Sequence, residues 1–314
     1  MKKKFRSSFK QGKWWKIPLL LILLLSFGTS LYFFLIYQEV KGTVNERMQE
    51  DIPAIEHSVT KKKLDRKAPL NVLLMGVDKR SNDRGRSDAI MVLTLEPSND
   101  RSQLISIPRD TRTTLVGEGE KNGVVDKINH AYAFGGPGMT VSTVEHLLEI
   151  EVDYYVKINM EGLVQMVDTV GGITVYNSME WTGENGFHYR PGELALNGEE
   201  ALQFVRMRYE DPEGDAGRNN RQREVIQGIL DEGAKISSIN KAEEIIGVLG
   251  DNVTMNMDFA TVQELLMHYR NTRNNMTTYQ MEGTGTMING IYYLQMSDEE
   301  IQQVHERITA YNPK

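Results

Sequence analysis

The 314-residue sequence contains no cysteine, which excludes disulfide bonds, zinc sites with thiolate ligands and catalysis by a thiol. It also lacks the Gly-x-Ser-x-Gly pattern of serine hydrolases, so acyl transfer has little support. There is no internal repeat and no long low-complexity tract. Any chemistry must therefore rest on the charged and polar side chains of an ordinary globular domain.

Charge is absent from residues 17–37, a run of 21 residues. At about 1.5 Å per residue, a helix of this length spans the roughly 30 Å hydrocarbon core of a membrane. The tail before it has no acidic residue, and the positive-inside rule places such a tail in the cytoplasm. Its basic residues are Lys2, Lys3, Lys4, Arg6, Lys10, Lys13 and Lys16. We therefore expect a membrane anchor. The alternative is a cleaved signal peptide, which usually has a shorter apolar region and a small-residue cleavage site.

The rest of the chain, residues 17–314, has more acidic than basic residues. Seven of the 36 basic residues lie in the tail, so 29 basic residues face 43 acidic ones in residues 17–314, a formal charge of −14. This balance argues against nonspecific binding to nucleic acid, and we expect no nucleic-acid partner. Local clusters of arginine in such a chain stand out as candidate sites.

The sequence divides into four segments. Residues 1–16 form the basic tail, 17–37 the anchor, 38–69 a charged stalk that is helical in part, and 70–314 the folded domain. About 245 residues in the last segment are enough to bury one large core.

Apolar patterning in the folded domain predicts alternating strands and helices. Short runs bounded by turn residues predict buried strands, and apolar spacing of three and four residues predicts helices. The expected strands are 72–75, 89–95, 104–107, 154–158, 173–176 and 291–295, and the expected helices are 139–148, 160–170, 197–204, 218–235, 241–249, 259–269 and 297–311. This order predicts an α/β fold with a mixed central sheet flanked by helices.

Five arginines stand within eighteen residues, between Arg206 and Arg223. Arg206 and Arg208 are two positions apart, so on a strand both side chains would lie on the same face. Arg218 and Gln222 are four positions apart, so on a helix they would share one face. Guanidinium groups hold phosphate oxygens in a two-pronged grip, so the cluster predicts an anion site, which Arg109 could join. The alternative is a solvated surface in which these arginines pair with neighbouring carboxylates.

Two carboxylates lie at expected strand ends, Asp78 after the first strand and Asp88 before the second. Mg²⁺ commonly binds one or two carboxylates together with substrate phosphate oxygens, and such a pair beside an arginine cluster suits it. The alternative is that Asp88 caps a turn and Asp78 pairs with Lys79 or Arg80.

Six segments taken in order resemble the LytR-CpsA-Psr family, and within it the wall teichoic acid ligases of Bacillus-type bacteria. The segments are 71–78 (NVLLMGVD), 85–88 (GRSD), 106–110 (SIPRD), 196–202 (LNGEEAL), 206–208 (RMR) and 215–222 (DAGRNNRQ). The resemblance covers residues 70–311, and the basic tail and anchor also match. It implies a single extracytoplasmic catalytic domain on the membrane of a Gram-positive bacterium, with a cytoplasmic N-terminus.

The resemblance implies that the protein transfers an anionic glycopolymer from a polyprenyl-pyrophosphate carrier to peptidoglycan, where a phosphodiester forms on a muramic acid hydroxyl. Carried over by position, Asp78 and Asp88 would hold Mg²⁺, with Mn²⁺ as a substitute. The residues implied to bind the pyrophosphate are Arg86, Arg109, Arg206, Arg208, Arg218, Asp215 and Gln222. Arg86, Arg109 and Asp88 are the implied catalytic residues, with Asp88 as the candidate base.

The implied chemistry agrees with the residues, because phosphoryl transfer requires mainly positioning and positive charge around developing oxyanions. A prenyl carrier also requires an apolar groove, which the sequence does not distinguish from core. Three alternatives remain: a lipid-pyrophosphate hydrolase with water as acceptor, a membrane-bound regulator, and a noncatalytic wall-polymer binding module. The regulator is disfavoured because the cytoplasmic tail is too short for a helix-turn-helix domain.

Overall fold

The structure is a computed structural model that describes residues 16–78, 85–184, 186–207, 211–234 and 247–311. The chain forms two compact units, residues 1–42 and 43–314. The first unit contains helix α1 (Lys16–Gly42), which is about 40 Å long and exposes its apolar side chains. Within the described residues, one helical stretch is long and apolar enough to cross a membrane, and its most apolar 18-residue window has a mean hydropathy of 2.4 and no buried residue. The expected anchor at residues 17–37 lies inside α1.

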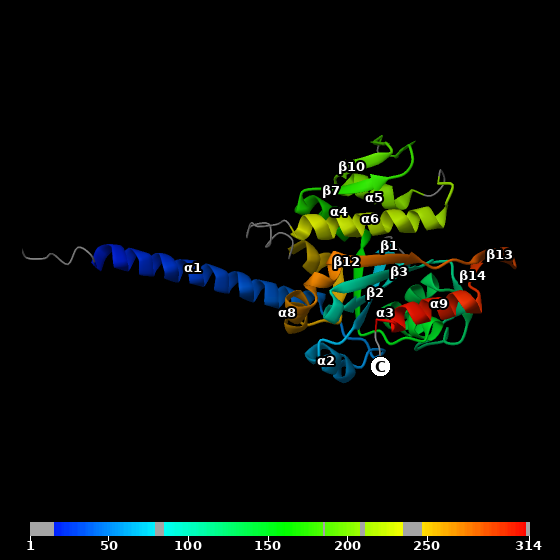
Figure 1. Ribbon diagram of the computed structural model, residues 1–314, viewed down its shortest axis with the longest axis horizontal. Coiled ribbons are helices and arrows are strands. Elements are labelled where there is room, and N and C mark those ends of the chain that lie inside the picture. The colour runs from blue at the N-terminus through cyan, green and yellow to red at the C-terminus, as the bar shows by residue number, and fades with distance from the viewer. Residues whose placement is uncertain (1–15, 79–84, 185, 208–210, 235–246, 312–314) are drawn as a thin grey trace, which may run out of the picture. The chain divides into compact units, whose positions relative to one another are not determined.

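A mixed six-stranded sheet forms the centre of the second unit, with the strand order β11-β6-β1-β2-β3-β12 (Figure 1). The central strands β1, β2 and β3 are antiparallel, whereas β6 pairs parallel with β1 and β12 pairs parallel with β3. The sheet strands are β1 (Leu70–Asp78), β2 (Arg86–Glu96), β3 (Arg101–Ile107), β6 (Tyr154–Asn159), β11 (Val253–Met255) and β12 (Asn275–Gln280). The predicted mixed α/β class is confirmed.

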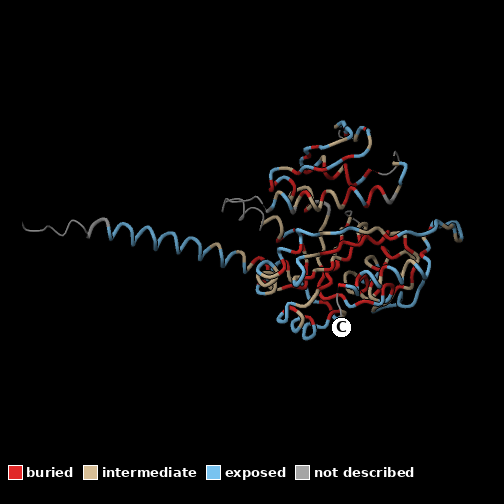
Figure 2. Tube along the Cα trace, in the orientation of Figure 1, coloured by how far each residue is buried: buried red, intermediate tan, exposed pale blue. Residues whose placement is uncertain are grey.

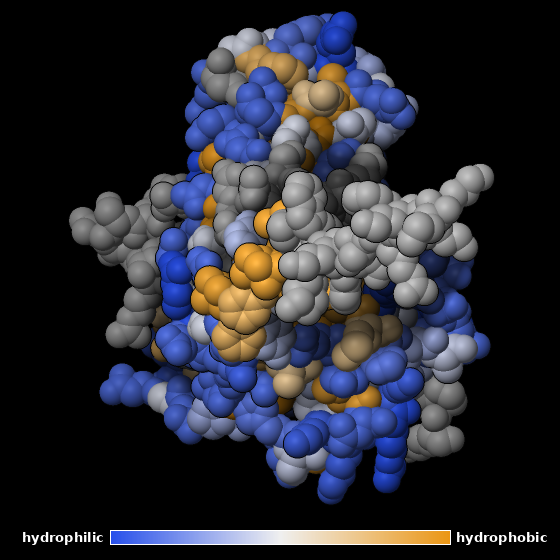
Figure 3. Space-filling model, turned by 90° about the vertical axis from the view of Figure 1, so that its left-hand side faces the viewer, coloured by the Kyte–Doolittle hydropathy of each residue, from blue (hydrophilic) through white to orange (hydrophobic). Residues whose placement is uncertain are grey.

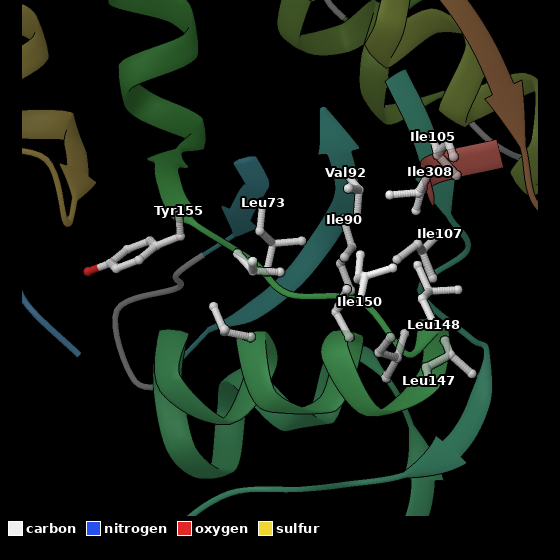
Figure 4. Packing of buried hydrophobic residues seen from close by; sticks show 14 of the residues in the cluster. Leu73, Ile90, Val92, Ile105, Ile107, Leu147, Leu148, Ile150, Tyr155 and Ile308 are labelled. Carbon is white, nitrogen blue, oxygen red and sulfur yellow. The ribbon is translucent and has the colours of Figure 1, made fainter. Parts of the chain in front are cut away.

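Helices α3 (Asn129–Leu148) and α9 (Asp298–Thr309) cover one face of the sheet. Figure 4 shows Ile90, Val92 and Ile105 of the strands directed toward apolar side chains at the end of α3 and in α9. Figure 2 shows the buried residues concentrated along this sheet. Close packing of branched aliphatic side chains on both layers fixes the strand ends that carry the candidate site.

The opposite face carries helices α4 (Met160–Val170), α5 (Gly198–Arg206) and α6 (Asp215–Ala234). These helices share a second core with the hairpin of β7 (Ile173–Asn177) and β10 (Gly192–Leu196). The ring of Tyr189 stacks on Trp181 with 3.8 Å between centroids and fixes the loop between the two strands. This second core holds α5 and α6 above the carboxyl end of β1.

The remaining elements are short. They are η2 (Thr43–Met48), α2 (His57–Asp65), η3 (Pro97–Asn99), β4 (Arg112–Thr114), β5 (Val125–Lys127), β8 (Trp181–Thr182), β9 (His188–Tyr189), α8 (Phe259–His268), η4 (Arg270–Asn274), β13 (Thr284–Ile288) and β14 (Ile291–Gln295). The molecular face seen in Figure 3 is mainly hydrophilic, with separate apolar areas.

Two expectations need correction. Residues 38–69 were predicted as a stalk, yet Val44, Met48, Ile52 and Ile55 in this segment are buried, so the compact unit begins at Thr43 rather than at residue 70. Arg206 was predicted on a strand, but it is the last residue of helix α5. A capping box between Asn197 and Glu200 starts this helix, and the apolar face of the helix packs into the second core. This packing favours helix up to Arg206, although the two-residue spacing of Arg206 and Arg208 also fits a strand.

Candidate active site

The ion pair between Arg109 and Asp88 is the centre of the candidate site. Arg109 Nη1 donates to Asp88 Oδ1 at 2.6 Å, and the two side chains are only 14% and 24% exposed. Asp88 is the extra residue of a β-bulge, because Gly76 pairs with Ala89 while Val77 pairs with Ser87. A bulge redirects a side chain at the end of a strand. The bulge and the turn after β3 therefore bring together two residues that are 21 positions apart.

Asp78 and Arg206 form a second, looser pair beside the first. Arg206 Nη2 lies 3.5 Å from Asp78 Oδ1, and the Arg206 side chain is 46% exposed. Arg86 is the strand partner of Asp78, so the pleat directs both side chains to the same face of the sheet. Arg86 is exposed and available to a ligand.

Helix α6 contributes a row of buried polar side chains. Arg218, Asn219 and Gln222 are buried, and within the described residues neither Asn219 Nδ2 nor Gln222 Oε1 has a hydrogen-bond partner. An unsatisfied buried amide costs about 1–3 kcal/mol, so these groups point to a ligand that is bound during function. The predicted helical face of Arg218 and Gln222 is confirmed.

Arg221 lies on the same helix but has a structural role. Its guanidinium donates to the carbonyl oxygens of Phe204 at 2.9 Å and Met207 at 2.7 Å, and it pairs with the buried carboxylate of Asp211. These contacts fix the end of α5 and the following turn.

Several predicted residues fall where the structure does not describe them. Arg80 and Arg208 lie outside the described residues. Asp215 is the first residue of helix α6, the helix that also carries Arg218 and Gln222.

Further polar residues lie beside Arg109: the resemblance matched Asp110, as a residue that orients Arg109, and Asn129, without a role, whereas Lys127 was not predicted. Asp110 Oδ2 lies 3.7 Å from Arg109 Nε, and Asp110 Oδ1 accepts a hydrogen bond from Lys127 Nζ at 2.7 Å. The backbone N–H of Asn129 donates to the Arg109 carbonyl at 3.2 Å. Lys127 and Asn129 belong to one short segment, 127–130 (KINH), and its density of polar residues before a helix was the available signal.

Asp126, in strand β5, forms hydrogen bonds with the side chains of His130 and Tyr293. His130 Nδ1 lies 2.7 Å from Asp126 Oδ2, and Tyr293 Oη donates to Asp126 Oδ1 at 3.2 Å. Burial alone would raise the pKa of the Asp126 carboxyl, but hydrogen bonds from His130 and the Lys127 N–H outweigh it and hold the pKa below its ordinary value. His130 is thus a hydrogen-bonded structural histidine.

An apolar cavity of about 250 Å³ lies between the sheet and helices α4 and α6. Gly76 and Ala89, which flank the bulge, line one part of it together with Gln222. The other residues around it are Leu74, Met75, Met91, Val156, Ile158, Asn159, Leu163, Met166, Val205, Val225, Ile226, Leu249 and Val253. The cavity therefore adjoins the arginines and carboxylates. Sequence patterning did not reveal it, because these side chains have the same spacing as core residues.

The donor set suits a hard divalent cation only in part. Asp78 and Asp88 supply carboxylate oxygens on neighbouring strands, which Mg²⁺ and Mn²⁺ accept. Within the described ranges no three His, Asp or Glu side chains gather as a metal cluster. The residues therefore fit a cation that completes its shell with water and substrate phosphate.

Comparison with known proteins places this arrangement in a family. The chain is 42% identical over 314 residues to the polyisoprenyl-teichoic acid–peptidoglycan teichoic acid transferase TagU of Oceanobacillus iheyensis, covering 96% of this chain and 95% of the relative. The crystal structure of Bacillus subtilis TagU has a TM-score of 0.63 at 41% identity and covers 79% of this chain and 98% of its own. A structure of TagT bound to LIIa-WTA has a TM-score of 0.65 at 28% identity and covers 86% of this chain and 96% of its own. The sequence profile of the LytR_cpsA_psr family matches residues 31–310, and the chain therefore belongs to this family.

Proposed function

We propose that this protein is a membrane-anchored phosphotransferase that moves wall teichoic acid, or a similar anionic glycopolymer, from a polyprenyl-pyrophosphate carrier to peptidoglycan. The observation that carries the proposal is the position of the apolar cavity beside Asp88 and Gln222. A lipid-linked pyrophosphate has the same two parts, an apolar chain next to a dense negative charge. The names of the relatives support the choice of polymer and acceptor, since they describe teichoic acid transfer to peptidoglycan.

The arginines bind the pyrophosphate and offset the charge that develops on its oxygens. Arg86, Arg109, Arg206, Arg208 and Arg218 are the proposed ligands, and Gln222 and Asp215 assist them. Charge-assisted, two-pronged hydrogen bonds of arginine match phosphate geometry and become stronger in a site with little water. The prenyl chain occupies the apolar cavity, so that binding of the lipid positions the pyrophosphate.

Asp88 is the proposed general base. In the transfer step a hydroxyl of the acceptor sugar forms a bond to the phosphorus that carries the glycopolymer, and its proton passes to Asp88. The bond from that phosphorus to the bridging oxygen breaks, and polyprenyl phosphate leaves. The ion pair with Arg109 orients the Asp88 carboxylate for this transfer.

Asp78 and Asp88 are the residues that would hold Mg²⁺, with Mn²⁺ as a substitute. When bound, the cation neutralises charge on the phosphate oxygens. Arg109 and Arg206 pair with these two carboxylates, so the arginines that would bind the phosphates lie next to the residues that would hold the cation.

Helix α1 serves as the membrane anchor in this proposal, with the basic tail in the cytoplasm and residues 43–314 outside. This topology places the site on the same side of the membrane as the peptidoglycan of a Gram-positive bacterium.

The test is transfer of a labelled lipid-pyrophosphate saccharide to peptidoglycan by the full-length chain in detergent with Mg²⁺. Wild-type protein should form the product, and Arg109→Ala and Asp88→Asn should lose it. Arg270→Ala, which removes an exposed arginine outside the cluster, is the matched control and should retain activity. Release of the saccharide into water without transfer would identify a hydrolase instead, and binding without cleavage would identify a noncatalytic module.

A further inference from the structure

A second, polar cavity of about 330 Å³ adjoins the candidate site. Pro108 and Asp110, the two neighbours of Arg109 in sequence, form part of its wall. Gly76 and Ala89, on either side of the bulge that carries Asp88, belong instead to the apolar cavity. The Arg109–Asp88 pair is therefore bordered by an apolar cavity on its Asp88 side and by a polar cavity on its Arg109 side.

Carboxylates predominate around the polar cavity, although Lys127 pairs with one of them, Asp110, at 2.7 Å, and this lining disfavours a second anion site. Asp110, Glu213 and Glu282 place three carboxylates around it, and Gln280 adds an amide whose Oε1 is held by Arg223 at 3.0 Å. A pyrophosphate or a teichoic acid phosphate in this position would be repelled. Carboxylate and amide oxygens are good acceptors for the hydroxyl groups of an uncharged ligand.

Tyr292 gives this cavity an aromatic wall. Its side chain projects from strand β14, is 46% exposed, and lies against Gly285 of strand β13. A Cβ at Gly285 would come within 2.9 Å of Tyr292 Oη, so the glycine leaves space for the ring to lie along the hairpin. An exposed ring beside hydroxyl acceptors is an arrangement that matches the apolar face and polar rim of a sugar.

We infer that this polar cavity is the subsite for the acceptor glycan, in which a sugar ring lies on Tyr292 and its hydroxyls bind Glu213, Gln280 and Glu282. The inference rests on the proposed function and adds the location of its second substrate. Donor lipid and acceptor sugar would then approach the Arg109–Asp88 pair from its two sides. An acceptor held at Asp110 has its reacting hydroxyl beside Arg109 and Asp88, because the Asp110 carboxylate lies 3.7 Å from the Arg109 guanidinium.

The experiment measures transfer by the full-length chain at fixed donor while a soluble glycan strand that contains muramic acid is varied. Tyr292→Ala should raise the acceptor KM roughly tenfold, about the effect of losing one aromatic contact. The donor KM should stay within twofold of wild type, and Tyr292→Trp should restore the acceptor KM. Glu282→Gln keeps the shape of the cavity and should raise the acceptor KM by a smaller factor.

Tyr176→Ala is the matched control, because this tyrosine is 62% exposed on strand β7 and does not border either cavity. Thermal melting of each variant checks the fold. An active enzyme whose acceptor KM is unchanged by Tyr292→Ala and Glu282→Gln would overturn the inference while leaving the proposed function intact. Wild-type protein that binds donor but never transfers it would overturn the proposed function, and the acceptor subsite with it.

Discussion

Arg109, in the turn after β3, and Asp88, in strand β2, are joined by a 2.6 Å hydrogen bond, and each has a sequence neighbour that lines a cavity. This pair couples the phosphate-binding group to the proposed base. Because each residue orients the other, loss of one should remove most of what the other contributes.

We therefore expect the effects of Arg109→Lys and Asp88→Asn to be strongly non-additive. Each single change should lower kcat by about 10²–10³, since lysine cannot reproduce the two-pronged grip and asparagine cannot accept the proton. The double variant should be little worse than either single one. Steady-state kinetics of the four proteins measures the coupling, and multiplicative losses would show that the two residues act independently.

Filling the apolar cavity should weaken binding of the lipid donor. Val156 lies on strand β6, next to β1 in the sheet, and lines the cavity, so Val156→Phe places a ring in the space proposed for the prenyl chain. The donor KM should rise by about tenfold or more. A donor with a truncated, water-soluble prenyl chain is the control, because its KM should not change. Equal losses with both donors would indicate a distorted site rather than a blocked cavity.

Arg221 and Arg206 should differ in their effect on stability. Arg221→Ala leaves the Asp211 carboxylate buried without its partner and should lower the free energy of unfolding by about 3–5 kcal/mol. Arg206→Ala removes an arginine that is half exposed and should change stability by less than about 0.5 kcal/mol while reducing donor affinity. Urea denaturation of both variants measures the contrast, and equal stability losses would contradict it.

Asp78→Asn should weaken activation by Mg²⁺. Loss of one carboxylate removes one of two proposed ligands, so the Mg²⁺ concentration for half-maximal activity should rise by about tenfold or more. Chelation of divalent cations should abolish wild-type transfer, and added Mg²⁺ should restore it. Full activity in the presence of a chelator would exclude the metal from the reaction.

Asp126 should stabilise the fold above the ordinary pKa of an aspartate, which is 3.8. Its pKa in the folded state is lowered, so the folded protein binds fewer protons than the unfolded chain, and this stabilisation is lost as the pH falls through the folded-state pKa. Asp126→Asn should be less stable than wild type at pH 6, and the difference should shrink below pH 3.8. A difference that did not change between these pH values would contradict the assignment.

The sequence was sufficient to predict the residues at the strand ends. Asp78 and Asp88 follow from short apolar runs with clear boundaries, and Arg109 and Arg218 follow from the arginine cluster; the resemblance added the roles that it implies for them. The helix that starts at Asn197 was predicted, but its end was placed at residue 204, because the two-residue spacing of Arg206 and Arg208 also fits a strand; α5 continues to Arg206.

Two features depend on tertiary structure. Leu74, Met91 and Val156 have the composition of core residues, and only the spacing between sheet and helices leaves a cavity beside them. Residues 43–69 are charged enough to suggest a stalk, yet their few apolar residues, including Ile52 and Ile55, pack into the main core. The average composition of a charged segment hides single apolar residues such as these.

The parallel pairing of β12 with β3 has a consequence for biosynthesis. Strand β12 spans Asn275–Gln280, and Gln280 accepts a hydrogen bond from Arg223 in α6, so this edge strand is tied to α6 close to the turn that carries Arg109. This pairing links segments more than 170 positions apart, and such contacts form late because closing a long loop is entropically costly. A nascent chain that has not yet produced residue 280 lacks this edge strand and the Arg223–Gln280 hydrogen bond, so the central sheet is completed only near the end of synthesis.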